Sequence, residues 1–252
     1  MIYMAVSDLG LKELSKLNEL EIFTTIISGA AHDIDHPGTN NVFEIKCKSK
    51  LALLYNDQSV LENHHAASFF FLVDNTSNNC DIMQFLSPEE STQVRKAVIE
   101  NILGTDMTKH GQIMKDLQEI TSMSPEEQSW DDKNKALLLK AVVHAVDISN
   151  PTREFKVAEF WSKKIVAEFF YQGDRERVLG LDITMMCDRH TSNFASGQIG
   201  FINFMIMPYF SLMAKILPKW GYAPDTCAKN LDIYKGLVEQ YEEDKKNGNP
   251  EL

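Results

Sequence analysis

The sequence predicts an all-α protein. Apolar residues recur every three or four positions along most of the chain, as they do on one face of an α-helix. No segment alternates apolar and polar residues with the period of two that a half-buried strand requires. The breaks between apolar segments are short and polar, so we expect one compact multi-helix domain over residues 1–252. Residues 241–252 are acidic and lysine-rich, and we expect them to form a solvated tail.

Two helices are predicted in the first half of the chain. The first spans residues 17–31, and Pro37 with Gly38 ends it, because proline cannot continue a helix. The second spans residues 89–105. Their apolar faces comprise Leu20, Phe23, Ile27 and Ala30 in the first helix, and Val94, Val98, Ile99 and Ile102 in the second.

Two further helices follow in the second half. An apolar helix spans residues 133–148 and ends at the "SNP" turn. The next spans residues 155–171, where Gly173 is the expected C-cap. The apolar side chains of this last helix recur in steps of four at Val157, Trp161, Ile165 and Phe169. The predicted loops are residues 75–79, 121–132 and 181–197, and the last of these is the longest.

Residues 199–217, "IGFINFMIMPYFSLMAKIL", are the most apolar segment of the chain. A membrane-spanning helix needs about 20 nearly uninterrupted apolar residues. Asn203, Pro208 and Lys215 interrupt this segment. We therefore expect a buried core helix here and no membrane span.

The composition excludes several classes of partner and site. The net charge of −11 disfavours binding to nucleic acid, which requires basic surface. The four cysteines form no Cys-x-x-Cys pair, so a cysteine zinc site is not expected. Reduced thiols, together with an N-terminus unlike a signal peptide, indicate a cytoplasmic protein.

The segment "AAHDIDHPGTNN", residues 30–41, places four metal-capable side chains directly after an apolar helix. At about 100° per residue, His36 falls about 40° from His32 on a helix, and Asp33 falls about 100° from it. These three side chains can therefore share one face at the last turn. Imidazole nitrogen and carboxylate oxygen are zinc ligands, and carboxylates also suit magnesium. The alternative is an ordinary polar helix end followed by a turn.

Two other segments carry similar groups. His144 and Asp147 end the apolar helix of residues 133–148. A buried carboxylate is usually paired or bound to metal, although Asp147 could also cap the turn that follows it. In "SVLENHHAA", Glu62 and His65 share a helix face, and a solvated face or a structural hydrogen bond is the simpler interpretation.

Six motifs in series resemble the catalytic domain of the class I cyclic nucleotide phosphodiesterases. They are "HDIDHPGTNN", "YNDQSVLENHH", "GTDMTKH", "HAVDISNPT", "EFFYQGDRE" and "CDRH…SGQIGFINF", and they run from about residue 18 to about residue 215. The resemblance implies an all-α, HD-type domain. It also implies metal-dependent hydrolysis of a 3′,5′-cyclic nucleotide, cAMP, cGMP or both, to the nucleoside 5′-monophosphate.

The resemblance also implies the metal site. His32, Asp33 and Asp147 match ligands of a zinc ion, and Asp33 would bridge to a second ion, Mg²⁺ or Mn²⁺. His36 matches a histidine beside the reacting atoms, so that His36 and Asp33 are the expected catalytic residues. The positions that match residues holding water molecules of the metal site are Asn41, Glu62, His65, Thr105 and Asp106.

The nucleotide pocket is implied in the same way. Gln198 matches a glutamine that hydrogen-bonds the purine, and Phe201 matches the aromatic residue stacked on it. Met107 and Ile165 match the apolar wall, and Asn150 matches an asparagine near the base. Without the resemblance, Phe201 and Ile165 would be assigned to the core. The choice between adenine and guanine stays open, because a glutamine amide can present either its oxygen or its nitrogen.

The chain departs from the family pattern at its start. That pattern has a His-Asn-x-x-His segment before "LNELEIF", where this chain has "MIYMAVSDLGLKELSK" without a histidine. The first histidine of that segment would protonate the leaving oxygen, and the second would bind zinc. We therefore expect a partial, N-terminally truncated catalytic domain with impaired hydrolysis.

Two alternatives to this enzyme remain open from the sequence. The first is a weak or inactive pseudo-enzyme that binds cyclic nucleotide and metal, and pairing as a homodimer is compatible with it. The second is another His-Asp phosphohydrolase, which the "SGQIGFINF" motif disfavours.

Overall fold

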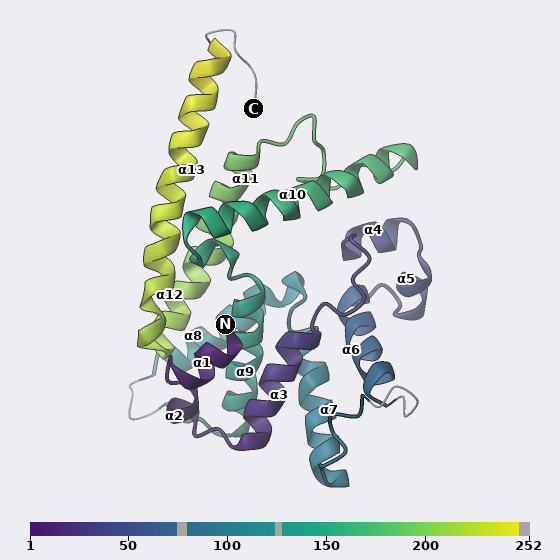
Figure 1. The fold of residues 1–252 in the computed structure, drawn as a ribbon, viewed down its shortest axis with the longest axis vertical. Coiled ribbons are helices and arrows are strands. Elements are labelled where there is room, and N and C mark those ends of the chain that lie inside the picture. Colours follow the sequence, from purple (N-terminus) through teal and green to yellow (C-terminus); the bar gives the residue numbers. More distant parts are fainter. Residues whose placement is uncertain (75–79, 124–127, 247–252) are drawn as a thin grey trace. The chain divides into compact units, whose positions relative to one another are not determined.

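The computed structural model describes residues 1–74, 80–123 and 128–246. Every regular element in these ranges is a helix and none is a strand, which confirms the all-α prediction. The chain divides into two compact units, Met1–Asp147 and Ile148–Leu252 (Figure 1). The expectation of a single catalytic domain stays a prediction.

The first unit contains short N-terminal helices followed by longer ones that carry the core. Its elements are α1 (Ile2–Ser7), α2 (Leu11–Ser15), α3 (Glu19–Ala31), α4 (Asn41–Lys46), α5 (Lys50–Leu54), α6 (Val60–Val73), α7 (Pro88–Leu103), the 3₁₀ turn η2 (Met107–Lys109), α8 (His110–Thr121) and α9 (Asp132–Asp147).

Capping side chains explain where helices α3 and α7 begin. The Asn18 side chain accepts a hydrogen bond from the Glu21 backbone N–H, and the Glu21 carboxylate accepts one from the Asn18 N–H, both at 2.8 Å. Ser87 and Glu90 form the same capping box at the start of α7, where Pro88 occupies the first turn. Each box satisfies two backbone donors that the helix leaves unpaired. The predicted helices 17–31 and 89–105 are thus confirmed as α3 and α7, and 133–148 as α9.

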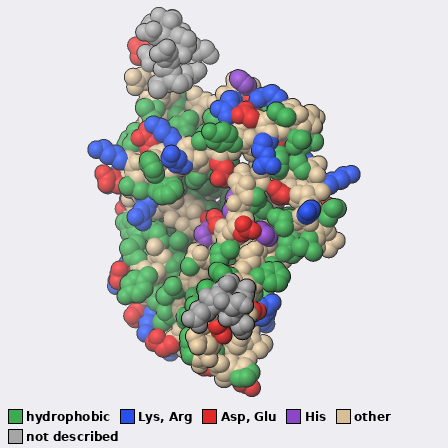
Figure 2. Space-filling view, turned by 45° about the vertical axis from the view of Figure 1, so that its right-hand side comes forward, with side chains coloured by type: hydrophobic (Ala, Val, Ile, Leu, Met, Phe, Trp, Pro, Cys, Tyr) green, Lys and Arg blue, Asp and Glu red, His purple; other side chains and the backbone are tan. Residues whose placement is uncertain are grey.

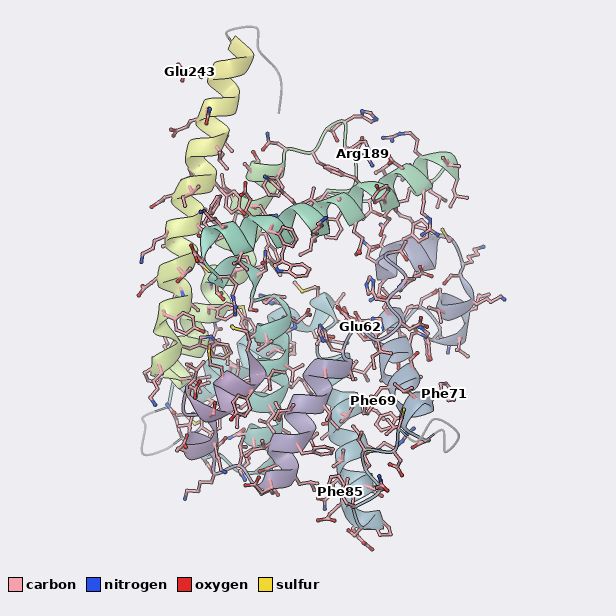
Figure 3. All side chains as sticks on the ribbon, viewed as in Figure 1. Glu62, Phe69, Phe71, Phe85, Arg189 and Glu243 are labelled. Carbon is pink, nitrogen blue, oxygen red and sulfur yellow. The ribbon has the colours of Figure 1, made fainter. Side chains whose placement is uncertain are left out.

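The core of the first unit lies among α3, α6 and α7. Figure 1 shows α3, α7 and α9 side by side, and α3 packs against both of the others. Figure 3 shows Phe69 and Phe71 on different sides of α6, and they are 6% and 78% exposed. The buried cluster comprises Ile27, Ala31, Ala66, Phe69, Phe70, Val73, Met83, Val94, Val98 and Ile102.

The second unit is built around its long helices. Its elements are η3 (Asn150–Thr152), α10 (Phe155–Val178), α11 (Phe194–Phe201), the π-helical segment η4 (Ile202–Ile206), α12 (Met207–Ile216), η5 (Pro218–Gly221) and α13 (Tyr222–Lys246). α13 packs against α11 and α12. Phe210 and Trp220, both fully buried, meet edge to face with ring centroids 5.5 Å apart.

Gly173 does not cap the predicted helix 155–171, and that expectation is wrong. α10 continues to Val178, and Gly180, with φ at +67°, follows its C-terminus instead. Gly173 lies where the next loop crosses the helix, and a Cβ atom there would collide with the carbonyl oxygen of Cys187. Close approach of two backbone segments therefore explains this glycine.

The stripe of apolar residues on α10 is not part of a core. Val157, Trp161 and Ile165 are 40%, 55% and 43% exposed. Their spacing of four predicts the helix, but not what covers that face. Ile165 therefore does not occupy the core position that its hydrophobicity alone would indicate.

Residues 194–216 form one continuous helical run through α11, η4 and α12. By length and composition this run could cross a membrane, since it contains an 18-residue segment with a mean hydropathy of 1.5, of which 39% is buried. Tyr209, Phe210 and Met213 of α12 are nevertheless fully buried within the structure. The core helix of a soluble protein can have the same length and composition. The expectation of a core helix therefore rests on these buried side chains.

The predicted loops and tail are covered in part. The loop 181–197 ends earlier than expected, because Asn193 caps α11 and Phe194 begins it. Residues 75–79 lie outside the described residues, as do 124–127 within the predicted loop 121–132. α13 extends through Lys246, while residues 247–252 are outside the described part, so the solvated tail stays a prediction.

Candidate functional site

The metal-capable residues of "HDIDH" lie on a turn, and the expected helical face is wrong in this detail. α3 ends at Ala31, and His32 is its C-cap. Asp35 adopts the left-handed conformation, with φ at +60°, so the chain turns before His36. The turn still brings His32 and Asp33 together, with His32 Nε2 3.4 Å from Asp33 Oδ2.

Asp147, at the last residue of α9, completes a cluster with these two side chains. Its Oδ1 atom lies 3.1 Å from His32 Nε2. One ligand atom from each of His32, Asp33 and Asp147 lies within 4.8 Å of the others. Figure 2 shows histidine and acidic side chains next to one another near the middle of the face. The structure thus places the three predicted zinc ligands where one ion could contact all of them.

The backbone fixes the orientation of His32. Its Nδ1 lies 2.9 Å from the Gly29 carbonyl oxygen, which can only accept, so Nδ1–H donates and Nε2 points toward the two carboxylates. Burial disfavours the charged ring, but the hydrogen bond and charge of Asp147, together with Asp33, outweigh burial and raise the pKa of His32 to about 9. Without a metal, a proton thus occupies the position that an ion would take.

A second group forms around the other oxygen of Asp33. Ligand atoms of Asp33, His36 and His65 also lie within 4.8 Å of one another. His65 donates from Nδ1 to the carbonyl oxygen of Ile34 at 2.7 Å, which leaves its Nε2 3.7 Å from Asp33 Oδ1. The rings of His36 and His65 stack with centroids 5.5 Å apart. Burial lowers the pKa of His65 and favours its neutral form.

His36 has the opposite tautomer. Its Nδ1 accepts a hydrogen bond from the Gly38 backbone N–H at 3.0 Å, so the proton of the neutral ring is on Nε2. His36 is exposed. It therefore presents a hydrogen-bond donor beside the carboxylate of Asp33, whereas His65 presents a lone pair.

Asn41 and Glu62, 21 positions apart, form a bonded pair. The Asn41 amide donates to both carboxylate oxygens of Glu62, at 3.2 and 2.9 Å, and its Oδ1 accepts from the Leu61 N–H. Burial raises the pKa of Glu62, and the charges of Asp106 and Asp33 act in the same direction. Figure 3 shows Glu62 near the start of α6.

Asp106 is buried but held as a carboxylate. Burial opposes its ionisation, yet hydrogen bonds from the Ser59 hydroxyl at 2.6 Å and the Thr108 N–H at 2.9 Å outweigh burial and lower the pKa of Asp106. Thr105 is also buried, and its hydroxyl donates to the Ile102 carbonyl within its own turn. Met107, expected on the wall of a nucleotide pocket, is 41% exposed.

His144 forms a buried pair with His110 beneath the end of α9. Their Nε2 and Nδ1 atoms are 3.0 Å apart. Burial and the neighbouring His110 lower the pKa of His144 to about 4. Two neutral imidazoles can share this hydrogen bond, whereas a charge on either would be unfavourable.

In the second unit, Asn150 and Gln198 are joined through Ser162. The Asn150 amide donates to Ser162 Oγ at 2.9 Å, so the Ser162 hydroxyl proton is free to donate to Gln198 Oε1, also at 2.9 Å. Asn150 also donates to the carbonyl oxygen of Ala158. This chain of bonds directs the Gln198 oxygen toward Ser162 and leaves its Nε2 as the donor for a ligand.

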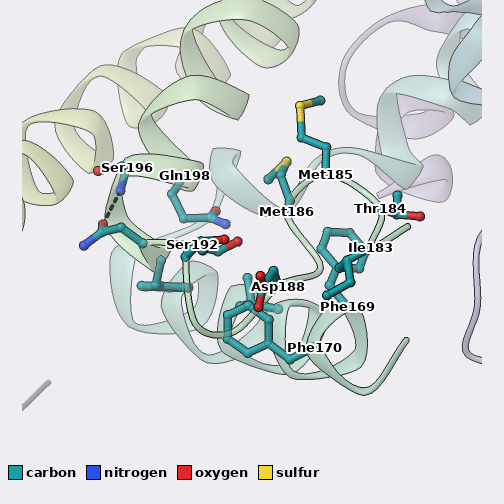
Figure 4. Close-up of a pocket in the computed structure, with 15 residues that line it drawn as sticks. Phe169, Phe170, Ile183, Thr184, Met185, Met186, Asp188, Ser192, Ser196 and Gln198 are labelled. Atoms are coloured by element: carbon teal, nitrogen blue, oxygen red, sulfur yellow. Dashed lines mark hydrogen bonds between the residues drawn. The ribbon is translucent and has the colours of Figure 1, made fainter. Parts of the chain in front are cut away.

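Gln198 lines a cavity of about 530 Å³ within the second unit. Figure 4 shows Met185 and Met186 beside it and Phe169, Phe170 and Ile183 from α10 and the following loop. The cavity therefore combines apolar side chains with a few polar groups, among them the amides of Gln198 and Asn193 and the carboxylate of Asp188, as small-molecule sites do. Phe201 at the end of α11 is half-buried, and it does not line this cavity.

Several residues of the site were not identified from the sequence. Ser59 fixes Asp106, and Ser162 joins Asn150 to Gln198. Ser59 lies inside the motif "YNDQSVLENHH" but no spacing singles it out there, and Ser162 lies outside all six motifs. His64 donates from Nε2 to Asp35 Oδ2 at 2.9 Å. Asp35 and His64 both lie in quoted motifs, but the sequence did not predict that they contact each other.

The donor set of the first cluster fits a divalent metal. It consists of one imidazole nitrogen and two carboxylates, all of which are zinc ligand types. The His32 ring is oriented by a backbone carbonyl, as metal-binding histidines are. The role of these residues as ligands stays a prediction.

Comparison with known proteins decides the family. The family profile described as 3′5′-cyclic nucleotide phosphodiesterase matches residues 1–227. The chain belongs to this phosphodiesterase family. Phosphodiesterases of this family are metal-dependent, which agrees with the clusters around Asp33.

Named phosphodiesterases and a solved structure are similar to the chain. The 3′,5′-cyclic-AMP phosphodiesterase 4C of Rattus norvegicus is 40% identical over 228 residues, covering 87% of this chain and 42% of that protein. The dual specificity calcium/calmodulin-dependent 3′,5′-cyclic nucleotide phosphodiesterase 1B of Bos taurus is 42% identical over 203 residues, covering 81% of this chain and 36% of that protein. The phosphodiesterase domain of Salpingoeca rosetta rhodopsin phosphodiesterase matches with a TM-score of 0.84 and 31% identity, covering 92% of this chain and 70% of that one.

The chain spans less than half the length of these two curated relatives. Its agreement with the phosphodiesterase structure extends the family match to the fold.

Proposed function

We propose that this chain hydrolyses a 3′,5′-cyclic nucleotide, cAMP or cGMP, to the nucleoside 5′-monophosphate. The observation that carries the proposal is the convergence of His32, Asp33 and Asp147, which are the positions expected to bind metal. The family match and the printed names of the relatives support it.

The proposed metal centre has two ions. Zn²⁺ would be held by His32, Asp33 and Asp147, and a second ion, Mg²⁺ or Mn²⁺, would share Asp33. Divalent ions in such a pair neutralise the charge of a phosphodiester. They also lower the pKa of a bound water molecule to near neutrality, so that it can act as the nucleophile.

The protein groups around the centre have separate tasks. His36 would donate a hydrogen bond from Nε2–H to an oxygen of the phosphate, because its Nδ1 accepts from the Gly38 N–H. The carboxylate of Asp106 stays ionised and can orient water. The same task is proposed for Asn41, Glu62, His65 and Thr105.

The second unit would bind the base. Gln198 Nε2 would donate to an acceptor on the purine edge, while Asn150 acts through Ser162 to hold the amide. Within the second unit, we assign stacking on the base to Phe201 and apolar contacts to Ile165. Met107, on η2 of the first unit, stays a predicted pocket residue. An exposed Ile165 is available for such a contact, which a core residue would not be.

A hydrolysis assay tests the proposal. The chain is stripped of metal, loaded with Zn²⁺ and then Mg²⁺ or Mn²⁺, and incubated with cAMP or cGMP while 5′-monophosphate is separated by chromatography. We expect product from the wild type and at least a 100-fold loss of rate in Asp33→Asn. Asp116→Asn, which changes a half-buried carboxylate of α8 bonded to Gln112 and outside the metal-capable clusters, should retain the wild-type rate. No product from either nucleotide with both ions bound would end the proposal.

The relatives bear on the other expectations. A binding-only pseudo-enzyme is not favoured, because the named relatives are phosphodiesterases. A cytoplasmic location stays a proposal. A homodimer stays a proposal, which a measurement of the molar mass in solution would test.

A further inference from the structure

Asp35 and His64 form a pair that none of the proposed tasks uses. Asp35 Oδ2 lies 2.9 Å from His64 Nε2, and a carboxylate only accepts, so Nε2–H donates. Asp35 is 75% exposed at its side chain and His64 is 18% exposed. An exposed aspartate side chain can adopt many solvated rotamers. The Asp35 carboxylate instead points at the His64 ring of α6.

The pair ties the metal-bearing turn to α6. Asp35 stands between Asp33 and His36 in the chain, and its φ of +60° marks the point where the backbone reverses. Residues other than glycine are disfavoured in this left-handed conformation, although Asp and Asn tolerate it better than most. The residue of this turn with left-handed backbone is therefore the residue that His64 holds.

A parallel contact lies one residue away on each segment. His65 donates to the carbonyl oxygen of Ile34, just as His64 donates to the carboxylate of Asp35. Two successive histidines of α6 thus hold two successive residues of the turn. Asp33 and His36 flank that doubly held segment, so their orientation depends on it.

We propose that Asp35 and His64 are positioning residues of the metal centre, which orient Asp33 and His36 by anchoring their turn to α6. The inference rests on the proposed function for its metal centre. Neither residue belongs to the two clusters of metal-capable groups, so both would act through Asp33 and His36. Partners that orient metal ligands typically change metal affinity by about 10–100-fold when they are removed.

Three substitutions separate the hydrogen bond from the backbone strain. Asp35→Gly removes the acceptor and also relieves the left-handed strain, so a loss in this variant cannot come from strain. Asp35→Asn keeps an acceptor oxygen and a residue that tolerates the conformation. Asp57→Gly is the matched control, because Asp57 is exposed and has the same φ of +60° on the turn before α6.

The test measures Mn²⁺ affinity of the zinc-loaded chain by electron paramagnetic resonance, together with kcat and KM for cyclic nucleotide. We expect Asp35→Gly and His64→Leu each to weaken Mn²⁺ binding by about tenfold or more and to lower kcat with little change in KM. Asp35→Asn should recover most of the affinity, and Asp57→Gly should match the wild type. The double variant Asp35→Gly/His64→Leu should lose no more than either single variant, because both remove one contact.

Equal Mn²⁺ affinity in the wild type and Asp35→Gly would overturn the proposal. So would an Asp35→Asn variant as impaired as Asp35→Gly, since the acceptor would then not matter. If the wild type binds Mn²⁺ with this pattern of variants but turns over no nucleotide, the proposed function fails while the positioning role stands.

Discussion

His32 Nε2 lies 3.1 Å from Asp147 Oδ1, although 115 positions separate the two residues in the chain. α3 and α9 pack against each other, and each ends at one of these side chains. Asp33 lies 3.4 Å from the same nitrogen. Three groups from two helix ends therefore surround a position that a proton occupies in the metal-free chain, and this is the position that we propose for a zinc ion.

Zinc binding should release about one proton at neutral pH. The carboxylates raise the pKa of metal-free His32 to about 9, so the ring is charged at pH 7 and must lose its proton to bind zinc. Apparent affinity should then rise about tenfold per pH unit and level off near pH 9. Calorimetry in buffers of different ionisation enthalpy measures the released protons. Binding without proton release would contradict this assignment.

Asp147→Asn should weaken zinc binding at least tenfold, because it removes a charged oxygen ligand. It should also bring the pKa of metal-free His32 down toward 6.5, since the hydrogen bond and charge of Asp147 are the largest causes that raise it. Zinc titration and an NMR titration of the His32 ring measure the two effects. Asp116→Asn serves as the control, and an unchanged His32 titration in Asp147→Asn would show that the pair does not form.

The folded state should lose stability on mild acidification because of His144. Its folded pKa of about 4 is below its ordinary value of 6.5, so the unfolded chain takes up a proton first as pH falls. The contribution is complete above pH 6.5 and is lost between pH 6.5 and 4, by up to about 3 kcal/mol. Urea unfolding at several pH values should show a weaker pH dependence in His144→Gln than in the wild type. His190→Gln, at an exposed histidine, should keep the wild-type dependence.

Gly173→Ala and Gly236→Ala should change the unfolding free energy in opposite directions. A methyl group at Gly173 meets the Cys187 carbonyl, so we expect a loss of about 1–3 kcal/mol. Gly236 is exposed inside α13 with open space around it, so alanine should stabilise the helix by about 0.5–1 kcal/mol. Chemical denaturation measures both. A neutral Gly173→Ala would mean that the loop after α10 does not cross the helix there.

Ser162→Ala should reduce discrimination between cAMP and cGMP. The Ser162 hydroxyl holds the Gln198 oxygen, and without it the amide can present either group to the base. Loss of one hydrogen bond is worth about 1 kcal/mol, so the ratio of kcat/KM for the two nucleotides should move about fivefold toward unity. Ser211→Ala, at an exposed serine of α12, is the control. An unchanged ratio in Ser162→Ala would show that Ser162 does not orient the glutamine.

The long helices could be predicted because their signals are local. α3, α7 and α9 carry apolar faces at helical spacing, and their bounds agree with the expected ranges to within about two residues. The end of α10 was wrong because a glycine in sequence does not reveal whether it caps a helix or admits another backbone. Gly173 serves the second purpose, through a loop that returns from residue 187.

By itself, the sequence determined the helices, the family motifs and the chemical types of the metal-capable groups, since helix periodicity and side-chain chemistry are properties of neighbouring residues. Only the tertiary structure decided that Asp147 meets His32, that His64 holds Asp35, and that Ser162 fixes Gln198. These contacts join residues 29 to 115 positions apart. Packing of whole helices brings such residues together, and no local pattern encodes which side chains then face each other.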